Sequence, residues 1–110
     1  MSLAGFQNIE TELSDKLKPL VDTVAHGLRK YTIDSPVKSA QIETGLKISG
    51  PELRAIVQHL RLQGMPVGSN GKGYYMARSK DEIKTTVQHL RQRAKIENRT
   101  ALALEESFSR

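Results

Sequence analysis

Apolar residues in the first quarter of the chain recur at intervals of three and four positions, the spacing of one face of an α-helix. They are Phe6, Ile9, Leu13, Leu17, Leu20, Val21, Val24 and Leu28. Pro19 interrupts this series. Because proline lacks a backbone N–H and clashes with the preceding turn, we predict two helices or one kinked helix here. The turn signal Asp34-Ser35-Pro36 marks where the helical region must stop.

Residues 37–46 are predicted to form a short second helix. Gly45 stands where the C-cap of this helix would fall. The inward candidates are Ala40, Ile42 and Leu46. The two residues that follow, 47–48, are too few for anything but a turn.

A third helix is predicted to begin at Ser49, whose side chain suits an N-cap. Pro51 lies in the first turn, where its missing N–H costs nothing, and Gly64 ends the helix. The apolar stripe of this helix consists of Leu53, Ile56, Val57 and Leu60. Two short helices joined by a turn of three or four residues form a helix-turn-helix signature.

Two strand-like stretches follow, at residues 65–68 and 73–77. Between them lies Ser69-Asn70-Gly71-Lys72, which is rich in residues that tolerate positive φ, so the pattern predicts a β-hairpin. Tyr74 and Tyr75 alternate between the two faces of a strand, so we expect one in the core and the other partly exposed.

A last helix is predicted from a cap at Ser79 to at least Lys95, with Asp81 and Glu82 in its first turn. Its apolar stripe, interrupted by Glu97, runs through Ile83, Val87, Leu90, Ala94, Ala101, Leu104 and Phe108. This stripe could pack on the first helix or pair with a second copy of the chain.

These elements predict a mainly α fold with a small β-hairpin, in the order of a winged helix-turn-helix with additional N- and C-terminal helices. The length of 110 residues suits one domain. We divide it into an N-terminal helical extension (1–18), the winged helix-turn-helix (19–78) and a C-terminal helix for packing or dimerisation (79–110).

The net charge of +5 is unevenly distributed. Residues 46–99 hold 11 Lys or Arg against four acids, a balance of +7, while the flanks are slightly acidic. A basic field confined to one part of a small domain suits a polyanionic partner, because neutralising phosphates releases condensed counterions. A merely solvated basic surface is the alternative.

Residues 48–64, ISGPELRAIVQHLRLQG, are followed by Met65-Pro66-Val67 and by Gly71-Lys72-Gly73-Tyr74-Tyr75. Together they resemble the N-terminal winged-helix domain of biotin-operon repressors. In that family a serine opens the recognition helix, a leucine and a glycine close it, and a Gly-Tyr pair starts the returning wing strand. The resemblance covers residues 20–78 and implies a DNA-binding fold. The ligase portion of those repressors does not occur in this sequence, so no biotin chemistry is implied.

On the third helix, Gln58 and Arg54 are expected to touch base edges, because Gln can pair with adenine and Arg with guanine. The alternative for Arg54 is a contact with phosphate, or a solvent-exposed charge that does not contact DNA. Ser49 and the N–H groups after it are expected to hold a phosphate, or to serve only as a cap. The predicted contact set on this helix is Ser49, Gly50, Glu52, Arg54, Ala55, Gln58 and His59.

In the hairpin, Lys72 is expected to reach phosphate or the minor groove, whereas Asn70 and Gly71 serve the geometry of the turn. The predicted contacts of the wing and its flanks are Lys38, Lys47, Ser69, Asn70 and Lys72. For the cations of the last helix, Arg91, Arg93, Lys95 and Arg99, a solvated face is favoured over DNA contact.

The sequence gives little sign of other chemistry. No nucleophile, base and orienting group are in view, and His26, His59 and His89 are far apart, so we expect no enzyme, metal site, cofactor or small-molecule ligand. The absence of cysteine and of a long apolar run favours a cytoplasmic protein without membrane contact.

The sequence therefore predicts a sequence-specific protein that binds double-stranded DNA, a transcriptional regulator of bacterial or phage type, with a homodimer through the C-terminal helix left open. Two rival functions remain. One is a winged helix that binds another protein, and the other is a replication or packaging adaptor that binds DNA only within a larger assembly.

Overall fold

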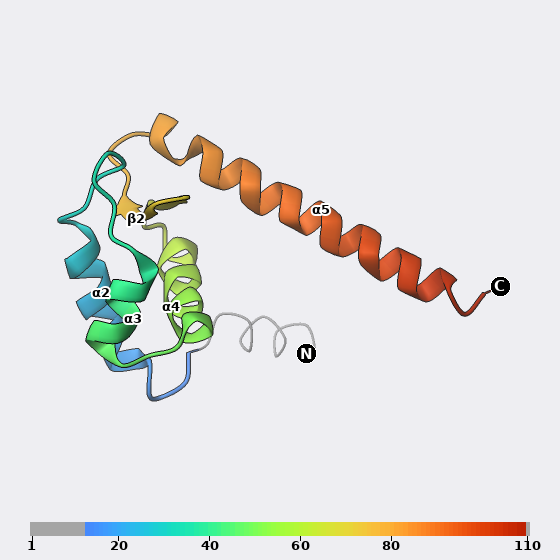
Figure 1. Cartoon of the computed structure of the whole chain (residues 1–110), viewed down its shortest axis with the longest axis horizontal. Helices are drawn as coiled ribbons and strands as arrows, with labels where there is room; N and C mark the ends of the chain where they lie inside the picture. Colours follow the sequence, from blue (N-terminus) through green and yellow to red (C-terminus); the bar gives the residue numbers. More distant parts are fainter. Residues whose placement is uncertain (1–12, 110) are drawn as a thin grey trace.

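The computed structural model describes residues 13–109. This part contains four α-helices, two short 3-10 helices and one two-stranded antiparallel hairpin (Figure 1). The bounds are η1 Lys18–Leu20, α2 Val21–Leu28, α3 Ser39–Leu46, α4 Gly50–Leu62, β1 Val67–Asn70, β2 Gly73–Met76, η2 Asp81–Ile83 and α5 Lys84–Glu106. The predicted class, mainly α with a small β-hairpin, is confirmed.

The first helical region is shorter than predicted. Residues 13–17 form no helix; instead the carbonyl of Ser14 accepts hydrogen bonds from the N–H groups of Leu17, at 3.0 Å, and Lys18, at 3.1 Å. The chain then passes through η1, which contains Pro19, into α2. The predicted helix of residues 1–18 is therefore wrong for 13–17, and Phe6 and Ile9 lie outside the described residues.

The second helix, α3, differs from the prediction at both ends. It starts at Ser39, because the backbone of Val37 is bonded to the hairpin instead. Gly45 lies inside the helix, and Lys47 is the C-cap, with a left-handed φ of 56° and ψ of 48°. Ala40, predicted to point inward, is exposed.

Helix α4 follows the prediction closely. Ser49 is its N-cap, Pro51 lies in its first turn, and Gly64 follows its end with a φ of 93°. Its apolar stripe is almost completely buried, at an exposed fraction of 2 % or less for Leu53, Ile56, Val57 and Leu60. Full burial of such side chains contributes about 1.5–3 kcal/mol each. Helix α4 is therefore the centre of the core, in contact with α2, α3 and β1.

The hairpin turn is shorter than predicted. Strands β1 and β2 pair in the register Val67↔Met76 to Asn70↔Gly73, so Ser69 and Asn70 belong to β1, and Gly71-Lys72 is the turn. Tyr75 is buried and Tyr74 half-buried, as alternation predicts. Val37 adds a bridge to β2, with its N–H and carbonyl each bonded to Tyr74 at 2.8 Å.

Helix α5 extends away from the other helices (Figure 1). It is preceded by η2 rather than by a side-chain cap at Ser79, and it continues beyond Lys95 to Glu106. Within the described part of α5 only Thr86 is buried, and residues 88–109 are all exposed. No helix among the described residues has the length and apolarity needed to cross a membrane.

Candidate functional site

The start of α4 is fixed by a reciprocal capping box. The hydroxyl of Ser49 accepts a hydrogen bond from the N–H of Glu52 at 3.2 Å, and the Glu52 carboxylate accepts one from the N–H of Ser49 at 2.9 Å. Lys16 approaches the same carboxylate at 2.9 Å. The bond from the Ser49 backbone, and next the Lys16 ammonium, lower the pKa of Glu52 below its ordinary value of 4.5. Glu52, predicted as a DNA contact, is thus engaged within the protein.

A groove lies between the exposed face of α4 and the first half of α5; we name it the α4–α5 groove. Its volume is about 680 Å³. It is lined by Arg54, Val57, Gln58, Arg61 and Leu62 of α4, Tyr74 of β2, and Leu90, Arg93, Ala94 and Glu97 of α5. The lining contains three arginines and one glutamate, so the groove is basic, and its leucines give it an apolar wall.

Arg61 connects the groove to the hairpin. Its Nε donates to the carbonyl of Val67 at 2.7 Å and its Nη2 to the hydroxyl of Ser69 at 3.3 Å. Burial, and to a smaller degree the charge of Arg93, lower the pKa of Arg61. A guanidinium nonetheless stays protonated at any physiological pH. The side chain therefore positions β1 and contributes positive charge to the groove.

A second hollow, which we name the α3–hairpin hollow, lies between the start of α3 and the hairpin. Its volume is about 750 Å³, and its lining includes Lys38, Ser39 and Ala40 on one side and residues 69–74 on the other. The first N–H groups of a helix carry partial positive charge. Within the described chain the N-cap of α3, Lys38, makes no side-chain cap bond. This hollow thus combines a helix N-terminus with two lysines, Lys38 and Lys72.

The hairpin turn is held by Asn70. Its Oδ1 accepts hydrogen bonds from the N–H groups of Lys72, at 2.8 Å, and Gly73, at 3.2 Å. The side chain of Lys72 is exposed at the tip. Asn70 shapes the turn, and Lys72 is the charged group that the turn presents.

Tyr74 is the one residue that lines both the α4–α5 groove and the α3–hairpin hollow, as the described chain shows them. We name their five cations, Lys38, Arg54, Arg61, Lys72 and Arg93, the basic strip. Two acids, Asp34 and Glu97, share the lining. These cations come from four segments that are distant in the sequence.

The structure groups some predicted contacts and separates others. Arg54 and Gln58 line the groove, and Lys38, Ser69, Asn70 and Lys72 line the hollow. Ala55 packs against the core, and His59 is half-buried. Lys47 is exposed in the turn before α4, Ser49 is exposed at its N-cap position, and Gly50 is half-buried.

The predicted contacts do not include three hydrogen-bond donors of the groove, Arg61, Tyr74 and Arg93. Arg61 follows Arg54 and Gln58 at helical spacing, so the helical periodicity of α4 could have placed it on the same face. Tyr74 was predicted only as one of two alternating strand residues. Arg93 was interpreted as part of a solvated face, because its position depends on the direction that α5 takes.

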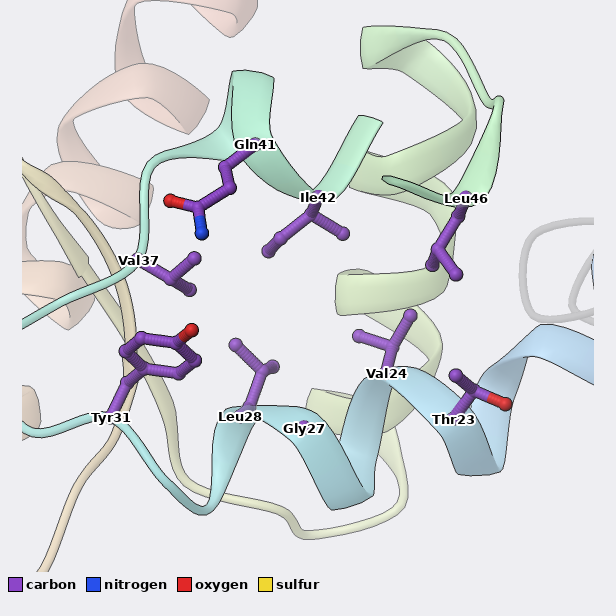
Figure 2. Close-up of a pocket in the computed structure, with 9 residues that line it drawn as sticks. All are labelled: Thr23, Val24, Gly27, Leu28, Tyr31, Val37, Gln41, Ile42 and Leu46. Atoms are coloured by element: carbon purple, nitrogen blue, oxygen red, sulfur yellow. The ribbon is translucent and has the colours of Figure 1, made fainter. Parts of the chain in front are cut away.

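A separate apolar pocket lies between α2 and α3 (Figure 2). Its volume is about 210 Å³, and side chains such as Val24, Leu28 and Ile42 point into it. None of its nine described lining residues is charged. It therefore adds nothing to the basic strip.

Comparison with known proteins found no matching family model, no matching curated protein and no matching solved structure.

Proposed function

We propose that this protein is a winged helix-turn-helix that binds double-stranded DNA. In this proposal α3 and α4 form the helix-turn-helix, and β1 and β2 form the wing. Three residues, 47–49, separate the two helices, and the hairpin follows directly after α4. The bridge between Val37 and Tyr74 joins the segment before α3 to the wing. This order and connection support the proposal.

The basic strip is the observation that carries the proposal. Five cations, from the N-cap of α3, from α4, from the hairpin turn and from α5, line two hollows that share Tyr74 and hold two acids. The DNA backbone presents a regular row of phosphates, and cations that neutralise them release condensed counterions. A protein surface with this charge pattern favours a polyanion over a neutral or acidic partner.

Base recognition is assigned to the exposed face of α4. Gln58 and Arg54 lie one helical turn apart on that face, and both can form paired hydrogen bonds with purine edges. Phosphate contact is assigned to Lys72 at the wing tip and to Lys38 with the start of α3. Contacts of both kinds would make the binding sequence-specific and allow a role as a transcriptional regulator of bacterial or phage type.

One observation favours a second function, the binding of another protein. Leu62, which is 59 % exposed, and Leu90, which is 42 % exposed, form an apolar wall in the same groove. An interface that rests on this wall should resist salt, whereas binding to phosphates should weaken steeply as salt is added. A replication or packaging adaptor would instead show weak DNA affinity alone, with no preferred site.

The test is a fluorescence-anisotropy titration of random-sequence duplex DNA at low and moderate salt. We expect salt-sensitive binding that Arg54→Ala with Lys72→Ala weakens and flattens in its salt dependence. The matched control is Arg29→Ala with Lys30→Ala, which removes the same charge from exposed residues that line neither hollow. Absence of binding at low salt, or equal weakening by both double variants, would contradict the proposal.

A further inference from the structure

Helix α5 carries an apolar seam with a heptad spacing. Positions 87, 94, 101 and 108 are Val, Ala, Ala and Phe, and positions 90, 97 and 104 are Leu, Glu and Leu. Spacing of three and four residues over this length is that of a helix that pairs with another helix. Leu90 is 42 % exposed, Leu104 66 % and Phe108, in the turn after the helix, 90 %. The seam is therefore uncovered within the described chain.

The rest of the protein supports α5 only at its beginning. Thr86 is buried and Val87 half-buried, and the exposed run of residues 88–109 follows. Most helices in proteins owe their stability to packing of an apolar face rather than to intrinsic propensity. A helix of 23 residues with an exposed seam is thus suited to a further packing partner.

The distribution of charge along α5 favours a second copy of the same helix, in antiparallel orientation, as the packing partner. The first half of the helix carries Lys84, Arg91, Arg93 and Lys95, whereas Glu105 and Glu106 lie at its end. Two parallel copies would place like charges side by side. Two antiparallel copies place the basic half of each helix against the acidic end of the other, which is favourable.

We propose that two copies of this chain associate through antiparallel pairing of α5. The register that aligns the seams places Leu90 against the partner's Phe108 and Ala94 against the partner's Leu104. It also places Glu97 against the partner's Ala101, a small residue that leaves room for the glutamate stem while the carboxylate reaches the edge. In the same register Arg91 lies beside the partner's Glu105, and symmetry repeats this ion pair.

The α4–α5 groove extends this interface. Leu90, Ala94 and Glu97 of the seam line the groove, so the end of the partner's helix enters it. There it meets the exposed apolar side chain of Leu62 and the charges of Arg54, Arg61 and Arg93. The exposed Leu104 and Phe108, together with Glu105 and Glu106, supply the matching apolar and acidic groups. Self-association does not depend on the proposed DNA function.

Sedimentation equilibrium of the full chain over a wide range of concentration tests this proposal. We expect a reversible dimer of 12.3 kDa chains. Leu104→Ser should raise the dimer dissociation constant by about a hundredfold, because two copies of this side chain lose their burial. The matched control is Leu102→Ser, which changes an exposed leucine off the seam and should leave the dimer unchanged. Circular dichroism verifies that both variants fold.

Charge reversal tests the direction of the pairing. Arg91→Glu and Glu105→Arg alone should each weaken the dimer about fivefold or more, and the two together should restore it. Asp22→Arg, which reverses an exposed acid of α2 outside the seam and the groove, is the control for net charge. A monomer at every concentration, equal effects of Leu104→Ser and Leu102→Ser, or failure of the double reversal to restore the dimer would overturn the antiparallel dimer.

Discussion

The hydroxyl of Thr86 is bonded to both backbone groups of Ser69. It accepts a hydrogen bond from the N–H of Ser69 at 3.0 Å and donates one to its carbonyl, also at 3.0 Å. A single buried side chain thus satisfies part of the outer edge of β1 and attaches the first turn of α5 to it. The hydroxyl of Tyr75 supports the same junction by donating to the carbonyl of Glu82 at 2.7 Å.

Replacement of Thr86 by valine should destabilise the protein by about 1–3 kcal/mol, because the shape is kept while two backbone groups lose their partner. Urea unfolding measures the change, and hydrogen exchange should show faster exchange in the first turns of α5. Thr85→Val is the matched control, because Thr85 is exposed and the same Thr-to-Val substitution there changes the helix propensity by the same amount. Equal losses in the two variants would contradict the assigned role of Thr86.

Gly73→Ala should be strongly destabilising, by about 3 kcal/mol or more. Gly73 has a φ of 148°, and a Cβ there would collide with the carbonyl of Val37. Gly71→Ala, two residues away in the same hairpin, meets nothing within 4 Å and should change the stability by less than about 0.5 kcal/mol. Thermal unfolding of both variants measures the difference, and a tolerated Gly73→Ala would contradict the close contact between Val37 and β2.

Loss of the α4 cap should also be measurable. Ser49→Ala removes the acceptor for the N–H of Glu52 and should cost about 1 kcal/mol. Ser39→Ala, at the first position of α3, is the control. A cost that is the same for both serines in urea unfolding would speak against the capping box.

The capping box predicts a pH dependence as well. The folded-state pKa of Glu52 lies below its ordinary value of 4.5, so its ionised form stabilises the protein above that value. This contribution is lost as pH falls through the lowered pKa. We therefore expect the stability difference between wild type and Glu52→Gln to be present at neutral pH and to vanish in acid. A difference that grows on acidification would contradict this sign.

If the protein binds DNA as proposed, Gln58 and Lys72 should differ in the kind of loss that they cause. Gln58→Ala should reduce the preference for a selected site by about 1–3 kcal/mol relative to a scrambled duplex. Lys72→Ala should weaken both duplexes equally and reduce the slope of log affinity against log salt by about 1. Titrations of both duplexes at several salt concentrations distinguish the two kinds of loss. If Lys72→Ala reduced the site preference and Gln58→Ala reduced the salt slope, the assignment of base contact to Gln58 and phosphate contact to Lys72 would be wrong.

The dimer and the proposed DNA site share the α4–α5 groove, because Arg54 and Gln58 lie in the same groove as the seam residues Leu90 and Ala94. Duplex DNA should therefore dissociate the dimer, and Leu104→Ser should bind DNA more tightly than wild type at concentrations where wild type is dimeric. Light scattering with and without duplex measures the first effect. A stable complex of one dimer with DNA through Arg54 would contradict this competition.

Local sequence determined the elements whose signals lie within a few residues. Ser49, Pro51, the buried stripe of α4 and Gly64 all acted as predicted, because capping and helical periodicity depend on near neighbours. The hairpin was predicted for the same reason, although Ser69 and Asn70 pair with β2 and so belong to β1 instead of the predicted turn. Of the candidate site, Arg54, Gln58 and Lys72 could be named because exposure on one helix or one turn follows from the same local rules.

Tertiary structure decided the rest. Val37 could have begun a helix, but its two hydrogen bonds to Tyr74 hold it beside β2, and α3 therefore begins only at Ser39. Lys47 rather than Gly45 takes the left-handed position, where the chain turns to bury Ile48. The direction of α5, and with it the presence of Arg93 in the groove, follows from the contacts of Thr86 and Tyr75 with distant backbone. No periodicity encodes such contacts, because they join segments that only the folded core brings together.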